Sequence, residues 1–141
     1  MESSISPFGY GPEHPGRYGM RLHHVQLAIP EGSEPRCREF WVETLGFLEI
    51  PKPPVLAQRG GLWVRCDALE VHLGVEDPFY PSKKAHPGIV VEDLEELAAV
   101  LEAAAHRVEW DDHFPAHRRF YCTDPFGNRL EFLSPDRPAA R

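Results

Sequence analysis

The sequence predicts an α+β protein in which two βαβββ modules pair to form a curved, cup-like mixed sheet. Strand and helix patterns follow one another in the same order twice along the 141 residues. Two pairs of polar residues repeat with this order, since 48 positions separate His24 from His72 and 45 separate His86 from Glu131. Hydrophobic residues make up 42% of the chain, which is enough for a core shared by two small modules.

The first module is expected over residues 20–76. Its elements, in chain order, are a strand over 22–29, a helix over 35–45, and strands over 47–50, 61–66 and 69–75. Ser33 stands where a helix N-cap is expected, and Gly46 ends the helix. The last two strands lie close enough in the sequence to form a hairpin around Asp67-Ala68.

The second module is expected over residues 85–135. Its elements are a strand over 86–91, a helix over 93–105, and strands over 107–110, 118–123 and 128–133. The helix is the clearest element of the chain, because Ala, Leu and Glu dominate it and its apolar residues fall on one stripe. The Asp-Pro-Phe-Gly-Asn run at 124–128 predicts a tight turn, since Pro125 presets φ and Gly127 tolerates a positive φ.

The remaining residues are expected to be tails, a Pro- and Gly-rich segment over 1–19 and a short one over 136–141, so that 20–135 forms a single domain. A formal charge of −7 and the lack of a basic stripe argue against nucleic-acid binding. No apolar run reaches the roughly 18 residues that span a bilayer, and the N-terminus has no signal-peptide pattern. A cytoplasmic protein without a membrane partner is therefore expected, and its three cysteines are expected to be reduced and mostly buried.

Strand alternation decides which side chains share a face. His24 shares a face with Gln26 and not with its neighbour His23. In the last strand, Glu131 shares a face with Arg129. These polar faces are the ones that can meet if the two modules curl toward each other.

The expected hairpin adds more side chains to the same face. A loop of two or four residues centred on Asp67-Ala68 places Trp63 opposite His72 and Arg65 opposite Glu70. Trp63 and Arg65 therefore join His72 beside the expected cup.

Four residues in equivalent positions of the two modules form a candidate metal-ligand set: His24, His72, His86 and Glu131. Three imidazoles and a carboxylate suit Zn²⁺, Ni²⁺, Fe²⁺, Mn²⁺ or Co²⁺. The alternative is that each histidine is a hydrogen-bonded structural residue and that Glu131 forms a weak ion pair with Arg129. The joint arrangement of the four on polar faces favours the metal site.

Five segments of the chain resemble the glyoxalase/bleomycin-resistance/extradiol-dioxygenase (vicinal oxygen chelate) superfamily, in order LHHVQLAIP, FWVETLGFLEI, LEVHLGV, AHPGIVVEDL and FYCTDPFGNRLEFL. The resemblance covers residues from about 20 to 135. Its more specific parts, the closing DP-x-GN-x-x-E motif and the helix-ending LGF, mark the fold rather than one reaction. The resemblance implies a glyoxalase-like fold and a homodimer in which the cup is often completed between copies.

The resemblance also implies roles for individual residues. His24, His86 and Glu131 match the most widely shared ligand positions, and His72 stands at a fourth, where metal-binding glyoxalases often carry Glu. Glu131 is the carboxylate available to move a proton. Tyr121 matches a substrate-facing tyrosine of fosfomycin-resistance enzymes and is the second expected catalytic residue. The side chains expected to contact the substrate are Gln26, Trp63, Arg65 and Arg119.

Two functions of different classes follow. The first is a divalent-metal-dependent enzyme (a lyase, isomerase, transferase or dioxygenase) acting on a small oxygen-rich molecule chelated to the metal. The second is a metal-free protein that binds or sequesters a drug or metabolite, as bleomycin-resistance proteins do. An inactive site in a purely structural protein is a third, weaker alternative. No short motif in this sequence identifies the metal, and none indicates that glutathione or O₂ takes part in a reaction.

Overall fold

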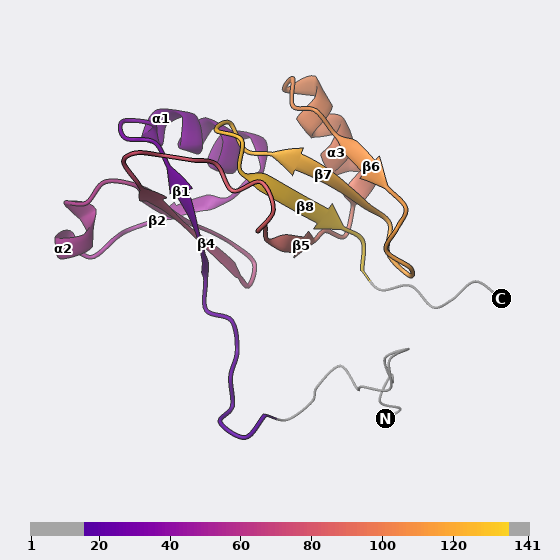
Figure 1. Ribbon diagram of the computed structural model, residues 1–141, viewed down its shortest axis with the longest axis horizontal. Coiled ribbons are helices and arrows are strands. Elements are labelled where there is room, and N and C mark those ends of the chain that lie inside the picture. Colours follow the sequence, from indigo (N-terminus) through magenta and orange to yellow (C-terminus); the bar gives the residue numbers. More distant parts are fainter. Residues whose placement is uncertain (1–15, 136–141) are drawn as a thin grey trace.

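The computed structural model describes residues 16–135 and contains the predicted order of elements twice (Figure 1). The first module contains β1 (Val25–Ile29), α1 (Glu34–Cys37), η1 (Arg38–Thr44), β2 (Leu48–Ile50), α2 (Pro54–Ala57), β3 (Leu62–Cys66) and β4 (Leu69–Val75). The second contains β5 (Gly88–Val90), α3 (Leu94–Ala103), β6 (Glu109–Asp111), β7 (Arg119–Thr123) and β8 (Arg129–Leu133). Both modules match the predicted α+β class. The short helix α2 was not predicted, because the Pro-rich run at 51–54 indicated only the end of a strand.

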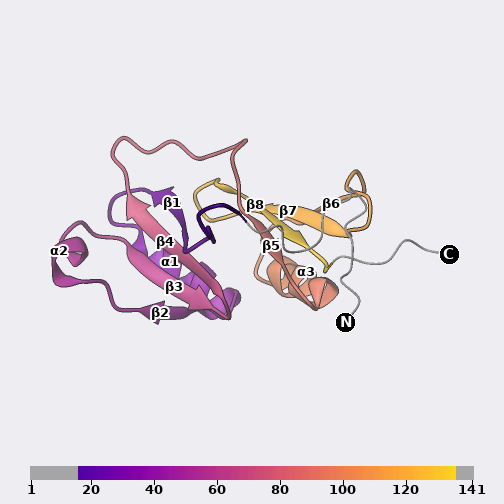
Figure 2. The same cartoon turned by 90° about the horizontal axis from the view of Figure 1, so that it is seen from below.

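Within residues 16–135 the strands form two four-stranded mixed sheets with the same topology. The strand order is β1-β4-β3-β2 in the first and β5-β8-β7-β6 in the second. The pairs β1–β4 and β5–β8 are parallel, and the other neighbours are antiparallel. Figure 2 shows the sheets side by side, joined by the connection from β4 to β5 that arches over the molecule.

One apolar core joins the two modules. The inward faces of both sheets and the helices contribute to a single cluster that includes Phe40, Trp41, Leu101, Phe120 and Phe132. All five of these side chains are almost fully buried. The opposite face of each sheet carries the polar side chains that strand alternation predicted, and these two faces are called the open faces below.

The first helix differs from the prediction in two ways. Ser33 lies at the N-cap, but its hydroxyl donates to the carbonyl of Pro30 and not to the helix, so the predicted side-chain cap is wrong. The 35–45 helix continues from α1 into a π-helix, η1, in which the backbone N–H of Leu45 donates to the carbonyl of Phe40. The wider turn brings Phe40 and Trp41 together into the core.

The first strand of each sheet begins later than the sequence predicted, and this changes where two of the predicted metal ligands lie. The strand expected over 22–29 begins at Val25, and the one expected over 86–91 begins at Gly88. His24 and His86 therefore precede their strands and lie outside the ladder. The hairpin register is confirmed, since Trp63 pairs with His72 and Arg65 with Glu70.

The turn between β7 and β8 connects the modules as well as its own strands. The fully buried Asn128 donates from Nδ2 to the carbonyl of Ala28 in β1, at 2.8 Å, and to the Asp124 carboxylate at 2.7 Å. Gly127 has φ of +96°, as the turn prediction required. Desolvation raises the pKa of Asp124, and its hydrogen bonds within the turn oppose that shift.

Two further expectations concern the tails of the chain and membrane-spanning helices. Most of the predicted N-terminal tail, residues 1–15, and all of the C-terminal one, residues 136–141, lie outside the described residues. Among those that are described, no helix is long and apolar enough to cross a membrane.

Candidate functional site

The open faces carry the predicted site residues at equivalent register positions in the two sheets. Across the first sheet, Gln26, His72 and Trp63 lie side by side on β1, β4 and β3. Across the second, Glu131 and Tyr121 occupy the positions that His72 and Trp63 hold in the first. The duplication predicted from the sequence therefore extends to the individual site positions.

In the first sheet, His72 lies between two other rings. Its imidazole stacks on His24 with ring centroids 3.9 Å apart and on Trp63 with centroids 4.0 Å apart. His24 is exposed, whereas His72 is only 5% exposed. The stack fixes the plane of the His72 ring, so that only the atoms at its edge are available for hydrogen bonds or a ligand.

A buried carboxylate holds the edge of the His72 ring. Nε2 of His72 lies 2.7 Å from Oε2 of Glu70, and Arg65 donates to the other oxygen of Glu70 at 2.7 Å. The hydrogen bonds from Arg65 and then His72 lower the pKa of Glu70 to about 2. Because Nε2 carries the proton donated to Glu70, a neutral His72 ring has its lone pair on Nδ1. Burial lowers the pKa of His72, against the opposing effect of Glu70, and this favours the neutral ring.

Glu70 was not among the predicted site residues, although the sequence contained the signal for it. It precedes His72 by two positions in β4, so both residues lie on the same face, and the hairpin register already placed it opposite Arg65. The first sheet therefore does contain a carboxylate next to His72.

In the second sheet, His86 and Glu131 form a direct pair. Nε2 of His86 lies 2.9 Å from Oε1 of Glu131, and Nδ1 of the same ring lies 2.8 Å from the carbonyl oxygen of Lys84. Both neighbours are hydrogen-bond acceptors, whereas a neutral imidazole carries one ring proton. A neutral ring can donate to only one of the two acceptors, so the other contact depends on a further proton or on a cation between His86 and Glu131.

Arg119, and not Arg129, is the cation that contacts Glu131. It donates to Oε2 of Glu131 at 3.2 Å and to Asp111 at 2.9 Å. The backbone N–H of His113, followed by Arg119, lowers the pKa of Asp111 to about 2. The loose Arg129–Glu131 ion pair considered as an alternative does not form.

Tyr121 lies in β7, next to Glu131, on the second open face. Its ring contacts His86 edge-on, with centroids 5.6 Å apart. The guanidinium of Arg129 lies 3.9 Å above the ring, and that of Arg119 lies 5.1 Å from its centroid. Tyr121 therefore connects the His86–Glu131 pair to a cationic region of the same sheet.

The structure places the four predicted metal ligands in two pairs, His24 with His72 and His86 with Glu131. Within residues 16–135 of one copy, no three His, Cys, Asp or Glu side chains are close enough to hold a metal ion together. Convergence of all four in one cup therefore stays a prediction, which a single copy of the chain does not fulfil.

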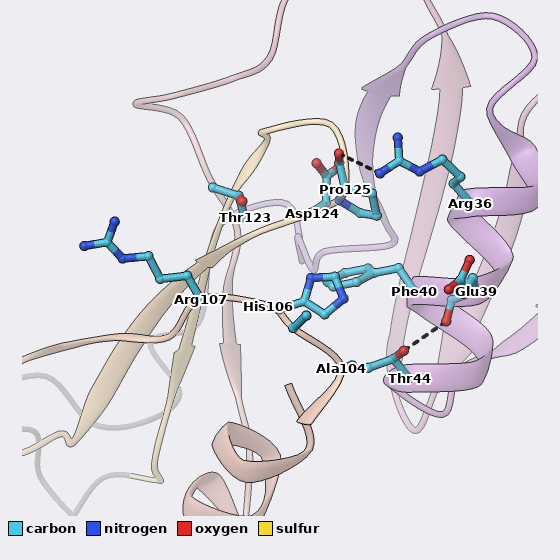
Figure 3. Close-up of a pocket in the computed structure, with 11 residues that line it drawn as sticks. Arg36, Glu39, Phe40, Thr44, Ala104, His106, Arg107, Thr123, Asp124 and Pro125 are labelled. Atoms are coloured by element: carbon cyan, nitrogen blue, oxygen red, sulfur yellow. Dashed lines mark hydrogen bonds between the residues drawn. The ribbon is translucent and has the colours of Figure 1, made fainter. Parts of the chain in front are cut away.

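A cavity of about 420 Å³ lies between the two modules (Figure 3). Arg36 and Phe40 from the first helical segment face His106, Asp124 and other residues of the second module across it. None of the predicted site residues lines this cavity. A second cavity, of about 350 Å³, does include Tyr121.

Comparison with known proteins supports the fold and the family. The sequence model of the Glyoxalase/Bleomycin resistance protein/Dioxygenase superfamily matches residues 21–132. The crystal structure of a protein assigned to the glyoxalase family, from Bacillus anthracis, is 42% identical, covers 87% of this chain and all of its own, and gives a TM-score of 0.82.

More distant structures show the same fold. The antibiotic-binding protein TnmS3 from Streptomyces sp. CB03234 is 23% identical, with 84% of this chain and all of that chain covered and a TM-score of 0.64. The virulence protein STM3117 from Salmonella typhimurium is 16% identical, with 82% and 96% covered and a TM-score of 0.62. No curated protein sequence matches the chain. The family match over residues 21–132, together with the duplicated βαβββ modules, shows that the chain belongs to the Glyoxalase/Bleomycin resistance protein/Dioxygenase superfamily.

Proposed function

We propose that this protein is a divalent-metal-dependent enzyme acting on a small oxygen-rich molecule, with a metal site shared between two copies of the chain. The site would combine His24 and His72 from one copy with His86 and Glu131 from the other. His72 and Glu131 hold equivalent register positions on the open faces of different sheets, and His24 and His86 precede the first strand of each sheet. A homodimer that places the first sheet of one copy against the second sheet of the other would bring both pairs together.

The observation that carries the proposal is the pair of acceptors around His86. Its Nδ1 faces the Lys84 carbonyl at 2.8 Å, and its Nε2 faces the Glu131 carboxylate at 2.9 Å. A histidine that ligates a metal through one ring nitrogen commonly donates its other N–H to a backbone carbonyl. His86 and Glu131 therefore fit a metal ligand pair whose ring orientation is already fixed.

The two histidines of the first sheet are less well oriented to bind the same metal. His72 is held by Glu70 with its Nδ1 lone pair available, but His24 lies flat against it, with an interplanar angle of 14°. Lone pairs of parallel rings do not point at one ion, so His24 must turn on metal binding. Its exposed position allows that movement.

When bound, the metal would polarise substrate oxygens and stabilise negative charge that develops on them. The residues of the chain have separate tasks. Glu131 accepts or returns a substrate proton at its carboxylate, and Arg119 orients that carboxylate through its bond to Oε2. Tyr121 presents its hydroxyl-bearing ring beside His86. Trp63 and Gln26 border the first half of the site.

A metal-free binding protein is the second candidate, and one observation favours it. The exposed His24 ring ends a stack of three rings with His72 and Trp63 on an open sheet face, and a planar ligand can extend that stack. One structural relative is described as an antibiotic-binding protein, which fits this alternative.

Metal analysis separates the two candidates. Protein purified without chelator and incubated with Zn²⁺, Ni²⁺, Mn²⁺, Fe²⁺ or Co²⁺ should retain one of these in a fixed ratio to the chain. His86→Ala and His24→Ala should each abolish retention, while the exposed His113→Ala control should retain the metal. Wild-type protein that retains none of the five metals would overturn the enzyme proposal and leave the binding protein.

A further inference from the structure

A cavity of about 350 Å³ on the second module has a cationic lining that the proposed chemistry does not use. Lys83, Arg107 and Arg129 line it together with Tyr121, and Glu109 is the acidic residue among its lining side chains. The chain as a whole has a formal charge of −7, so this concentration of positive charge runs against its average composition.

Two of the three cations have no acidic partner. Arg107 and Glu109 form an ion pair at 3.1 Å and neutralise each other. Within residues 16–135, neither Lys83 nor Arg129 has a carboxylate within ion-pair distance. By contrast, the site arginines Arg65 and Arg119 both contact carboxylates. The cavity therefore has two unneutralised positive charges at its edge.

Arg129 is oriented to use its charge on a ligand. Its guanidinium lies 3.9 Å above the Tyr121 ring, a contact that holds one flat face of the group. A guanidinium held by its face has its N–H groups at the edge, where they can donate two parallel hydrogen bonds to an oxyanion.

The loop that carries Lys83 is fixed to β8. The N–H of Ser82 donates to Oδ1 of Asn128 at 2.9 Å, and the N–H of Arg129 donates to the carbonyl of Ser82 at 2.9 Å. On the other side of Lys83, the carbonyl of Lys84 contacts His86. The backbone of Lys83 is thus held beside Arg129, so that only its side chain has to be ordered when a ligand binds.

We propose that this cavity binds the carboxylate or phosphoryl group of an anionic small molecule, with Arg129 as a two-point donor and Lys83 as a point charge. Tyr121 lies between the cavity and the His86–Glu131 pair, so the rest of the same molecule can reach the reacting site. That this anion is the substrate rests on the proposed function, but anion binding itself requires no metal.

Nuclear magnetic resonance of the full chain, freed of metal on a chelating resin, tests the proposal. Millimolar methylphosphonate or acetate is added at constant ionic strength, and the probe that binds more tightly identifies the group. The backbone amide signals of Lys83, Thr123 and Arg129 should shift. Arg129→Gln should weaken binding about tenfold and Arg129→Lys less, because Lys keeps the charge and loses the second hydrogen bond.

Two further variants make the test specific to the cavity. Lys83→Gln should weaken binding severalfold, and Lys84→Gln, which removes an adjacent charge that does not line the cavity, should leave it unchanged. Three results would overturn the proposal. They are no shift with either probe, Lys83→Gln and Arg129→Gln variants that bind as tightly as the wild type, or a Lys84→Gln variant that weakens binding as much as Lys83→Gln does. Because the protein is metal-free, these results leave the metal proposal untouched.

Discussion

His86 and Glu131 are 45 positions apart in the sequence, yet Nε2 of the histidine lies 2.9 Å from Oε1 of the glutamate. The contact forms because β5 pairs with β8 in parallel, with Gly88 next to Glu131. His86 lies two residues before Gly88 and reaches back over the strand to the carboxylate. The same relationship of first and last strands repeats in the first sheet with His24 and His72, which is why these pairs are the centre of the proposed site.

Replacement of Glu131 by Gln removes the carboxylate charge and keeps the size of the side chain. We expect metal affinity to fall at least about tenfold, because a neutral amide oxygen is a poorer ligand and no longer fixes His86. Equilibrium dialysis with Zn²⁺ measures the change, and Glu102→Gln on the exposed surface of α3 is the control. Equal affinities in the wild type and Glu131→Gln would show that Glu131 is not a ligand.

Glu70 should contribute to stability in a defined range of pH. Its pKa is lowered from 4.5 to about 2 in the folded protein, chiefly by Arg65. The contribution is therefore fully present above pH 4.5 and is lost as the pH falls toward about 2. The pKa of Asp111 is also lowered to about 2, so Asp111 changes stability over a similar pH range. The contribution of Glu70 is therefore measured as the difference between the wild type and a Glu70 variant.

Glu70→Gln should accordingly lose less unfolding free energy than the wild type when the pH is lowered through this interval. Urea denaturation at several pH values measures the slope. If Glu70→Gln and the wild type lose stability in parallel, the Arg65–Glu70–His72 contacts do not hold Glu70 charged.

Asn128→Ala should destabilise the protein by about 3 kcal/mol, because it leaves several buried groups without partners. The amide contacts the carbonyl of Ala28, the carboxylate of Asp124 and the N–H of Ser82. Gln58→Ala, at an exposed amide, is the matched control. Similar urea midpoints for the two variants would mean that the turn does not hold the modules together.

The shared site requires a dimer, and exposed apolar residues on the open faces are suited to its interface. Val90 in β5 is 58% exposed and Leu48 in β2 is 68% exposed. We expect the wild type to sediment as a dimer and Val90→Lys or Leu48→Lys to shift it toward monomer without loss of secondary structure. Val55→Lys, at a 71% exposed position in α2, should not. A monomeric wild type would contradict the shared site.

The local structure followed from the sequence to a large extent. Alternation of polar and apolar residues identified the strands, and the spacing around Asp67-Ala68 predicted the pairing of Trp63 with His72. These features depend on neighbours within a few residues, where sterics and turn chemistry act directly. The family resemblance identified the Tyr121 position, which the structure places on the second open face.

Contacts chosen by side-chain conformation could not be predicted in this way. Parity allowed either Arg119 or Arg129 to contact Glu131, and the structure pairs Arg119 with it while Arg129 lies over Tyr121. Glu70 is different, because its shared face with His72 and its register opposite Arg65 already pointed to it, and the structure adds that its Oε2 contacts His72.

The sequence alone determined the two residue pairs, His24 with His72 and His86 with Glu131, because each depends on a repeated module whose strands pair in one register. Only the tertiary structure decided that the two pairs do not meet within residues 16–135 of one copy. That placement depends on how helices, sheets and the Asn128 turn pack into one core, a sum of many weak contacts between distant residues. No local pattern encodes such a sum, and we propose that a dimer brings the two pairs together.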